Sequence, residues 1–421
     1  MKILLLNQCF YPDVASTAQH LADLAVELVE NGHEVTVVAS DRGYDDSSVR
    51  FSRRETWKGV NIIRIPSLAL GKSAKWRRVV NFASYMFVCA LRLLFLPRFD
   101  AVLALTSPPL ISVLGSLFVS LKGGRLIFWV MDLNPDEAIA AGWLRESSLL
   151  TKMLSAFLRY SLRHAERIIV LDRFMKERII AKGIAEEKIE IIPPWSHTDA
   201  VSFDQAGREA FRRAHGLSDK FVVMYSGNHS PCHSLETLLE AAAQLAANDR
   251  VRFCFVGGGS AYQSVKDYAQ ENKLTNILCL PYQPLNQLSA SLSAADLHAV
   301  VLGDSFRGIV HPCKIYNILE IAAPVLYIGP ATSHVIDVVA KLEDQSSLCS
   351  VRHGDVATLR DYIATRAQDE AGKRNTSAAA LASSFSPDAL LPEMLRVIEC
   401  APGQQFKSRA VVSDTKEQWL S

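Results

Sequence analysis

The sequence predicts an α/β protein built from two Rossmann-like, doubly wound parallel-sheet domains that face a cleft. Three observations support this fold class. The chain has 421 residues, a length that suits two domains of roughly 200 residues better than one hydrophobic core. Short apolar runs alternate with segments of helical periodicity, and this alternation stops once and then restarts. Hydrophobic residues make up 49% of the chain, which excludes a disordered protein.

The first half of the chain contains seven predicted strands with helices between them. Lys2–Asn7 is a continuous apolar run, which is typical of a strand buried on both faces. The following segment, residues 16–31, has apolar residues at helical spacing and ends before Gly32, where a helix C-cap belongs. The other predicted strands are Glu34–Ala39, Asn61–Ile65, Ala101–Leu105, Leu126–Val130, Arg167–Leu171 and Lys188–Ile192.

The alternation breaks at Pro193-Pro194-Trp195 and restarts near residue 217. We therefore predict a first domain at 1–195, a linker at 196–216 and a second domain at 217–385. A C-terminal helix at 386–400 is expected to pack back toward the first domain, and a polar tail follows at 401–421. The predicted strands of the second domain are Phe221–Tyr225, Val251–Val256, Ile277–Leu280, Leu297–Leu302 and Val325–Ile328, with helices beginning near Ser234, Ser260, Leu285 and Lys314.

Cysteine spacing and the N-terminus indicate a cytoplasmic protein. The eight cysteines are scattered and form no C-x-x-C pair or zinc spacing, so they read as reduced core thiols. The N-terminal apolar run is short and lacks the small-residue cleavage site of a signal peptide. The formal net charge of +1 argues against a nucleic-acid partner held by bulk positive charge.

The most apolar window, Val79–Pro97, is marginal in length for a membrane span and contains Arg92. Two interpretations stay open: a core helix, or a basic and apolar helix that touches an anionic membrane surface. The second is supported by the basic residues that precede the window, which are Lys72, Lys75, Arg77 and Arg78.

Two glycine-containing turns follow predicted strands of the second domain. Gly257, Gly258 and Gly259 lie between a strand and a helix, where glycines let a ligand approach the backbone closely; an ordinary tight turn is the alternative. The other turn is Ser226-Gly227-Asn228-His229, with His233 shortly after it. These histidines are candidates for contacting a diphosphate, although isolated histidines are often structural.

Lys314 lies at the start of a predicted helix that follows a strand. Helix N-termini attract phosphate, and a lysine there adds a full positive charge. The neighbouring residues, Pro312-Cys313 and Ile315-Tyr316, are too apolar for an exposed surface, which favours a phosphate site over a random surface lysine.

In the first domain, Asp132-Leu133-Asn134-Pro135-Asp136 follows the strand Leu126–Val130 and is expected to face the cleft. Asp132 is a candidate for binding a sugar hydroxyl or acting as a base. Asp136 is a candidate for the same site or for capping a helix. The chain contains no D-x-D pair, which weighs against a diphosphate held through a divalent metal.

Taken in order, these stretches resemble glycosyltransferase family 4, which has the GT-B fold, and more narrowly its bacterial O-antigen and exopolysaccharide branch. The resemblance runs along nearly the whole chain. It rests on Asn7–Asp13 with Ser16–Gln19, Gly32–Val37, Asp132–Asp136, Pro193–Trp195, Tyr225–His229 and Pro312–Tyr316.

The resemblance implies a retaining transfer of a hexosyl or N-acetylhexosaminyl group from a nucleotide-sugar, expected to be a UDP-sugar, with no metal or other cofactor. It implies that Lys314, Asp132 and His229 are catalytic. It implies donor contacts for Ser226, Gly227, Asn228, His233, Gly257, Gly258, Gly259, Tyr282, Ile315 and Tyr316. On the acceptor side it implies Ser16, Thr17, Asn134 and Asp136.

The expected acceptor is a polyprenyl-diphosphate-linked or other glycan, and the expected location is the cytoplasmic face of the inner membrane. The chain departs from the family where many members carry two glutamates, because Ile309 and Asn317 stand at those places. Two alternatives therefore stay open: a catalytically inactive subunit that binds a nucleotide-sugar, and a nucleotide-sugar epimerase of the same fold.

Overall fold

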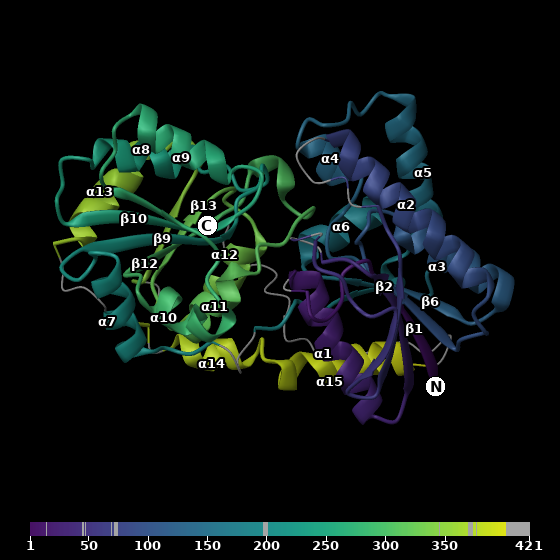
Figure 1. The fold of residues 1–421 in the computed structure, drawn as a ribbon. Helices are drawn as coiled ribbons and strands as arrows, with labels where there is room; N and C mark the ends of the chain where they lie inside the picture. The colour runs from purple at the N-terminus through teal and green to yellow at the C-terminus, as the bar shows by residue number, and fades with distance from the viewer. Residues whose placement is uncertain are drawn as a thin grey trace, which may run out of the picture.

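The computed structural model describes residues 1–13, 15–43, 46, 48–68, 70, 75–196, 201–344, 346–368, 374–375 and 377–400. These residues form two α/β domains, each with a sheet between layers of helices (Figure 1). The predicted fold class of two doubly wound parallel-sheet domains is confirmed. Lys72 and the tail at 401–421 lie outside the described residues.

The first domain contains an eight-stranded sheet in the order β3-β4-β2-β1-β5-β6-β7-β8. Its inner strands are almost wholly buried, as their continuous apolar sequences require. The strands are β1 (Lys2–Leu6), β2 (Glu34–Ser40), β3 (Arg54–Trp57), β4 (Val60–Ile65), β5 (Ala101–Ala104), β6 (Arg125–Trp129), β7 (Arg167–Val170) and β8 (Ile189–Ile191). The helices are α1 (Ser16–Glu30), α2 (Lys75–Leu94), α3 (Ile111–Lys122), α4 (Asp136–Ala140), α5 (Leu149–His164), α6 (Arg173–Ala181) and the 3-10 turn η1 (Glu186–Lys188).

The second domain contains a six-stranded parallel sheet in the order β11-β10-β9-β12-β13-β14. Its strands are β9 (Phe221–Asn228), β10 (Val251–Gly258), β11 (Ile277–Leu280), β12 (Leu297–Val301), β13 (Val325–Ile328) and β14 (Leu348–Val351). The helical elements from the linker onward are α7 (Gln205–Ala214), α8 (Glu236–Gln244), α9 (Tyr262–Glu271), η2 (Leu285–Gln287), α10 (Leu288–Ser293), η3 (Asp304–Phe306), α11 (Lys314–Glu320), α12 (His334–Val339), α13 (Val356–Arg366), α14 (Ala378–Ser383) and α15 (Pro387–Glu399).

The strand order reverses once in each sheet, and ligands of doubly wound sheets bind beside such reversals. In the first domain the reversal lies between β1 and β5, so the loop after Leu6 sits beside it. In the second domain it lies between β9 and β12, beside the turn that begins at Gly227. The topology therefore brings the loop before α1 and the turn after β9 to the ligand-binding edges of their sheets.

Several elements differ from the sequence prediction. The edge strand β3 pairs antiparallel with β4 and was not predicted, because its charged sequence RETW lacks an apolar run. The short strand β14 was also missed. The segment predicted as a linker contains α7, an amphipathic helix capped by Asp204 and packed on α10. The glycine turns 226–228 and 257–258 extend β9 and β10 instead of leaving them.

The C-terminal helix α15 runs below both domains and lies against α1 of the first domain (Figure 1). Ser386 caps it and Pro387 fixes its first turn. Its last turn is held by two contacts with the first domain. His33 hydrogen-bonds Glu399 at 2.7 Å, and the Arg125 guanidinium donates to the Ile398 and Cys400 carbonyls.

None of the eight cysteines forms a disulfide in the described part of the chain, as the scattered spacing predicts. Among the described helices, none combines the length and apolar character that a bilayer crossing needs. The apolar window at 79–97 forms most of α2, which buries Tyr85, Cys89 and Leu93 and exposes other apolar side chains.

Candidate active site

The carboxyl ends of β9 and β10 lie side by side and consist largely of glycine. Gly227 pairs with Gly257 and Asn228 pairs with Gly258. Both Gly227 and Gly257 have φ of +133°, which other residues rarely adopt. A Cβ on Gly257 would lie 2.1 Å from the Gly227 carbonyl oxygen. The glycines therefore allow two strand ends to meet without side chains between them.

Lys314, the first residue of α11, lies directly beside this turn. A Cβ on Gly227 would approach the Lys314 Cε to 2.6 Å. The Lys314 Nζ stands 4.6 Å from the centre of the Tyr225 ring, a cation–π distance. Burial lowers the pKa of Lys314 to about 8. The structure thus brings Gly227, Gly257 and the desolvated Lys314 ammonium together at one edge of the sheet.

Tyr282 lies on the outer side of the same turn. Its side chain is about half exposed, and a Cβ on Gly258 would come within 2.9 Å of the ring. A Cβ on Gly259 would meet Asn228 Oδ1 at 2.2 Å. Ser226 is partly buried and Asn228 is exposed. An exposed aromatic ring beside two bare strand ends is a suitable surface for a flat nucleobase.

The two histidines of the turn lie deeper than expected for phosphate ligands. His229 is fully buried among Tyr225, Phe255 and Tyr262, and burial lowers its pKa to about 4. Its Nδ1 hydrogen-bonds the Gly227 carbonyl, and its backbone N–H donates to Gly258. His233 is held by the Val301 carbonyl. These neutral rings support the shape of the turn and do not supply positive charge.

Ile315 and Tyr316, which the resemblance places at the donor, are both buried side chains. Ile315 is fully buried, and Tyr316 is buried with its hydroxyl 2.7 Å from His311 Nε2 and its ring against Phe385. Both residues belong to the buried face of α11, together with Ile318 and Leu319. The sequence correctly predicted a helix here but not which of its faces is buried.

Asp132 and Glu137 form an acidic pair in the first domain. Burial and, to a smaller extent, the negative charge of Glu137 together raise the pKa of Asp132 to about 7. Burial also raises the pKa of Glu137, whose carboxylate accepts a 3.1 Å hydrogen bond from Asn134. Glu137 was not predicted, although its place in the same acidic stretch as Asp132 was a visible signal.

The acidic pair and Lys314 lie within electrostatic range of the same cysteines of the second domain. Asp132 and Lys314 act electrostatically on the thiols of both Cys232 and Cys313. Ser16, the first residue of α1, is exposed, and its side chain hydrogen-bonds Cys313 across the domain boundary. The next residue, Thr17, is partly buried. No ion pair joins Asp132 to Lys314 among the residues that the structure describes.

Asp136 does not belong to this group. Its carboxylate pairs with Lys182, the C-cap residue of α6, at 2.6 Å, and Pro135 rather than Asp136 is the N-cap of α4. Asp136 thus links the start of α4 to the end of α6, and the capping role that was the alternative for it is not observed.

Ile309 and Asn317 occupy the two places where many family members carry glutamate. Ile309 is buried at the boundary between the domains, and its carbonyl accepts a 2.9 Å hydrogen bond from the Leu133 backbone N–H. The neighbouring Gly308 packs on the backbone of Phe174. A Cβ on Gly308 would lie 2.5 Å from the Phe174 carbonyl oxygen. Asn317 is partly buried on α11. This segment therefore joins the two domains directly.

A buried cluster of Asp172, His311 and His334 lies at the same boundary. Asp172 caps α6 and accepts a 2.7 Å hydrogen bond from His311 Nδ1. Burial alone would raise the pKa of Asp172, but this bond and the two neighbouring imidazoles lower it to about 2. The two imidazole rings stack at 3.7 Å with an angle of 26°. Since stacked rings direct their lone pairs in parallel, this arrangement suits a hydrogen-bonded contact between domains better than a metal ion.

Comparison with known proteins agrees with the two-domain organisation. Residues 17–195 match the family described as glycosyl transferase 4-like domain, and residues 207–303 match glycosyl transferases group 1. WcaI of Escherichia coli K12, named as a glycosyl transferase of colanic acid biosynthesis, is 26% identical over 335 residues, which cover 76% of this chain and 81% of WcaI.

Two solved structures share the fold at low sequence identity. Sucrose-phosphate synthase from Thermosynechococcus elongatus superimposes with a TM-score of 0.75 and 14% identity, covering 94% of this chain and 98% of its own. HepE of Anabaena, solved with UDP-glucose, has a TM-score of 0.68 and 18% identity, covering 94% of this chain and 99% of its own.

Proposed function

The chain belongs to the GT-B glycosyltransferases that join a glycosyl transferase 4-like domain to a group 1 domain, and we propose that it transfers a sugar from a UDP-sugar, with retention, during the assembly of a surface polysaccharide. The observation that carries this proposal is the convergence of Lys314 with the bare ends of β9 and β10, opposite Asp132. The name of WcaI supports polysaccharide assembly, and the ligand of HepE supports a UDP-sugar donor.

In the proposed reaction, the donor diphosphate binds at the turn after β9. The Lys314 ammonium, close to Gly227, stabilises the negative charge that develops as the bond between sugar and diphosphate breaks. Because the surroundings of Lys314 are largely desolvated, its charge acts more strongly than it would in water. Lys314 and the backbone N–H groups of the turn would supply this stabilisation without a metal ion.

The first domain supplies the acceptor side. Among the described residues, no basic side chain forms an ion pair with Asp132, so its carboxylate is available to orient and deprotonate an acceptor hydroxyl. Its raised pKa places its titration close to neutral pH, which suits a group that exchanges a proton during the reaction. Ser16 lies beside Cys313 and is positioned to contact the same acceptor.

We further propose that α2 rests on the cytoplasmic face of the inner membrane, where a polyprenyl-diphosphate-linked acceptor would be embedded. Its outward side chains include Trp76, Val79, Phe87 and Leu94, which are all more than half exposed. Arg77 and Arg78 begin the helix, and Leu121 of the adjacent α3 is also exposed. A helix with exposed apolar residues and basic ones suits an anionic bilayer surface.

Donor binding and transfer are tested separately. Uridine diphosphate should raise the melting temperature, and a panel of UDP-hexoses and UDP-N-acetylhexosamines with a lipid-linked acceptor should give one glycosylated product. Nucleotide binding without transfer to any acceptor would instead support a binding subunit, and release of an altered sugar without acceptor would support an epimerase. Absence of both binding and transfer would contradict the proposal.

Membrane association is tested with vesicles that contain phosphatidylglycerol. Phe87→Ser combined with Leu94→Ser should weaken vesicle binding, because it removes exposed apolar area from α2. Leu285→Ser, which changes a similarly exposed leucine in the second domain, is the matched control. Equal binding of all variants would show that another surface is responsible.

A further inference from the structure

Helix α6 of the first domain contacts the second domain through side chains of its first two turns. The Arg173 guanidinium donates two hydrogen bonds to the Asp337 carboxylate of α12, from Nε to Oδ2 at 2.6 Å and from Nη2 to Oδ1 at 3.1 Å. The Arg178 Nε donates to the Arg307 carbonyl at 2.6 Å. Since two parallel bonds between a guanidinium and a carboxylate fix direction as well as distance, the first of these contacts orients α6 against α12.

The same helix holds the boundary segment, which consists of residues 307–311 of the second domain. Gly308 packs on the Phe174 backbone. Asp172, the N-cap of α6, accepts the 2.7 Å hydrogen bond from His311 Nδ1. Together with the bond from α6 to the first carbonyl of the segment, these contacts hold the segment along its length and not at a single point.

The boundary segment connects the two groups of the candidate active site. Its Ile309 carbonyl accepts a 2.9 Å hydrogen bond from the backbone N–H of Leu133, the residue after Asp132. The imidazole at the end of the segment lies 2.7 Å from the Tyr316 hydroxyl of α11, the helix that begins with Lys314. The position of the carboxylate relative to the ammonium therefore depends on how this segment is held.

The contacts of α6 include one buried pair and one exposed pair. Asp172 and His311 are both buried, whereas the side chains of Arg173 and Asp337 are 46% and 35% exposed. Removal of one partner from a buried pair strongly destabilises the contact, because the other partner stays buried without its counter-charge. An exposed pair contributes less to the stability of the fold, so its charges can be exchanged while the core stays intact.

We propose that the first two turns of α6 are a positioning element for sugar transfer, and that they set the distance between Asp132 and Lys314 through the boundary segment. This inference rests on the proposed function, because it concerns how the base and the diphosphate-binding lysine are brought together. The proposed donor contacts all lie in the second domain, so loss of this element should spare the affinity for uridine diphosphate. Transfer needs groups from both domains, so kcat should fall.

The first test reverses the exposed pair and then restores it. Arg173→Asp and Asp337→Arg each place like charges at the contact, so each should lower kcat by about tenfold while calorimetry gives the native affinity for uridine diphosphate. The double variant, Arg173→Asp with Asp337→Arg, should recover most of the native kcat because the pair is restored with its ends exchanged. A double variant as impaired as the product of the two single losses would overturn the proposal.

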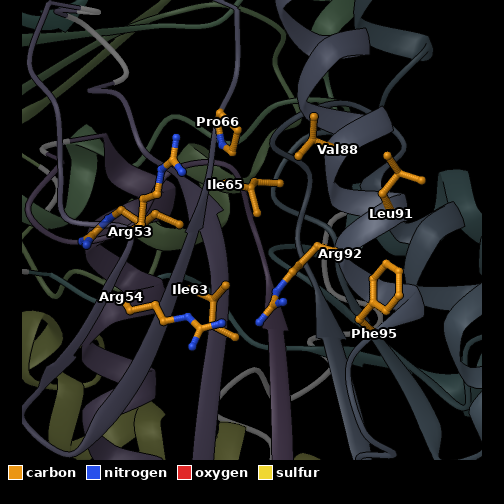
Figure 2. Close-up of a pocket in the computed structure, with 10 residues that line it drawn as sticks. Arg53, Arg54, Ile63, Ile65, Pro66, Val88, Leu91, Arg92 and Phe95 are labelled. Carbon is orange, nitrogen blue, oxygen red and sulfur yellow. The ribbon is translucent and has the colours of Figure 1, made fainter.

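The matched controls reverse charges away from the domain boundary. Figure 2 shows Arg53 beside a groove between β4 and α2, and the residues that line this groove all belong to the first domain. Arg53→Asp makes the same change of charge in the same domain and, assayed without vesicles, should keep the native kcat. Asp361→Arg changes an exposed carboxylate of α13 in the second domain and should do the same. Equal losses in the controls and the boundary variants would overturn the proposal in favour of a general effect of surface charge.

The second test does not depend on activity. His311→Phe keeps an aromatic ring between His334 and Tyr316 but removes the hydrogen bond to Asp172. Hydrogen exchange of the backbone amides at 307–311 should become faster in this variant and in the charge-reversed ones, because the segment is no longer held along its length. A native affinity for uridine diphosphate shows that each variant is folded. Exchange at the native rate in all of them would overturn the proposal.

The positioning element and the proposed function fail in different ways. A native protein that transfers no sugar would contradict the proposed function, while faster exchange in the boundary variants would still support the hold of α6 on the segment. Native kinetics in every variant would overturn the positioning role and leave the proposed function intact. A kcat above the native value in Arg173→Asp would show that the contact restrains the reaction, which also overturns the positioning role.

Discussion

The two groups of residues at the domain boundary differ in composition and in the sign of their charge. The second-domain group (Gly227, Gly257 and Lys314) consists of bare backbone and one cation, and burial lowers the pKa of that cation to about 8. The first-domain group (Asp132 and Glu137) consists of two carboxyl groups, and burial raises the pKa of both. In both groups, burial favours the uncharged form of the titratable side chains. Among the described residues, no ion pair joins the two groups.

This difference shows how one site can serve two substrates. A direct ion pair between Asp132 and Lys314 would fix both charges and shift both pKa values away from neutrality. Their separation by Cys232 and Cys313 leaves the cation for the diphosphate and the carboxylates for the acceptor. Variants of one group should therefore alter one substrate and spare the other.

The largest effect is expected for Lys314→Ala. Loss of the ammonium beside Gly227 should weaken binding of uridine diphosphate and lower kcat by about 10²–10³-fold, because the leaving diphosphate would lose its principal positive charge. Steady-state kinetics and calorimetry with uridine diphosphate measure both changes.

The matched control for this variant is Lys266→Ala. Lys266 also lies 4.6 Å from the centre of a tyrosine ring, that of Tyr262, but on the outer helix α9. It should behave like the native protein. Similar losses in both variants would mean that the lysines act through packing on tyrosine and not through the diphosphate.

The next largest effect is expected for Asp132→Asn. The amide keeps the shape of the side chain but cannot accept a proton, so kcat should fall by about 10²-fold while the affinity for uridine diphosphate stays unchanged. Titration of the nucleotide and kinetics at saturating acceptor distinguish the two quantities.

Asp136→Asn serves as the neighbouring control. It removes the ion pair with Lys182, so it should lower the melting temperature with little change in kcat. A loss of nucleotide affinity in Asp132→Asn would contradict the division of roles between the two groups.

The sequence predicted the second-domain group better than the first. Lys314 and its glycines follow strands at predictable places, and parallel strands bring such places to one edge of a sheet. By contrast, the burial of His229, Ile315 and Tyr316 depends on which helix face meets the core, which a strand-and-turn pattern does not define.

Contacts between the two domains were the least predictable feature. Asp172 and His311 are 139 residues apart in the chain, and only the packing of the domains brings them to 2.7 Å. The pairing of Asp136 with Lys182 likewise depends on how α4 lies against α6. Short motifs indicate where a strand ends but not which distant side chain will neutralise a charge.

A smaller effect is expected for Tyr282→Ala. If the exposed ring over Gly258 stacks on the nucleobase, its loss should raise the donor KM by about tenfold and leave kcat and the acceptor KM unchanged. Tyr282→Phe should retain native kinetics, because stacking needs the ring and not the hydroxyl. A change in acceptor KM would show that this surface is not limited to the donor.

The smallest effect, and the most specific to the acidic pair, is expected for Glu137→Gln. Activity should rise with pH as Asp132 ionises near its pKa of about 7 and fall as Lys314 loses its proton near its pKa of about 8. Removal of the Glu137 charge lowers the pKa of Asp132, so the acidic limb of kcat/KM should move to lower pH by roughly half a unit. The basic limb should stay in place because Glu137 does not act on Lys314. Glu146→Gln, which changes an exposed glutamate after α4, should move neither limb. A shift of both limbs would mean that the two groups titrate together, and the separation of charges across the boundary would then be wrong.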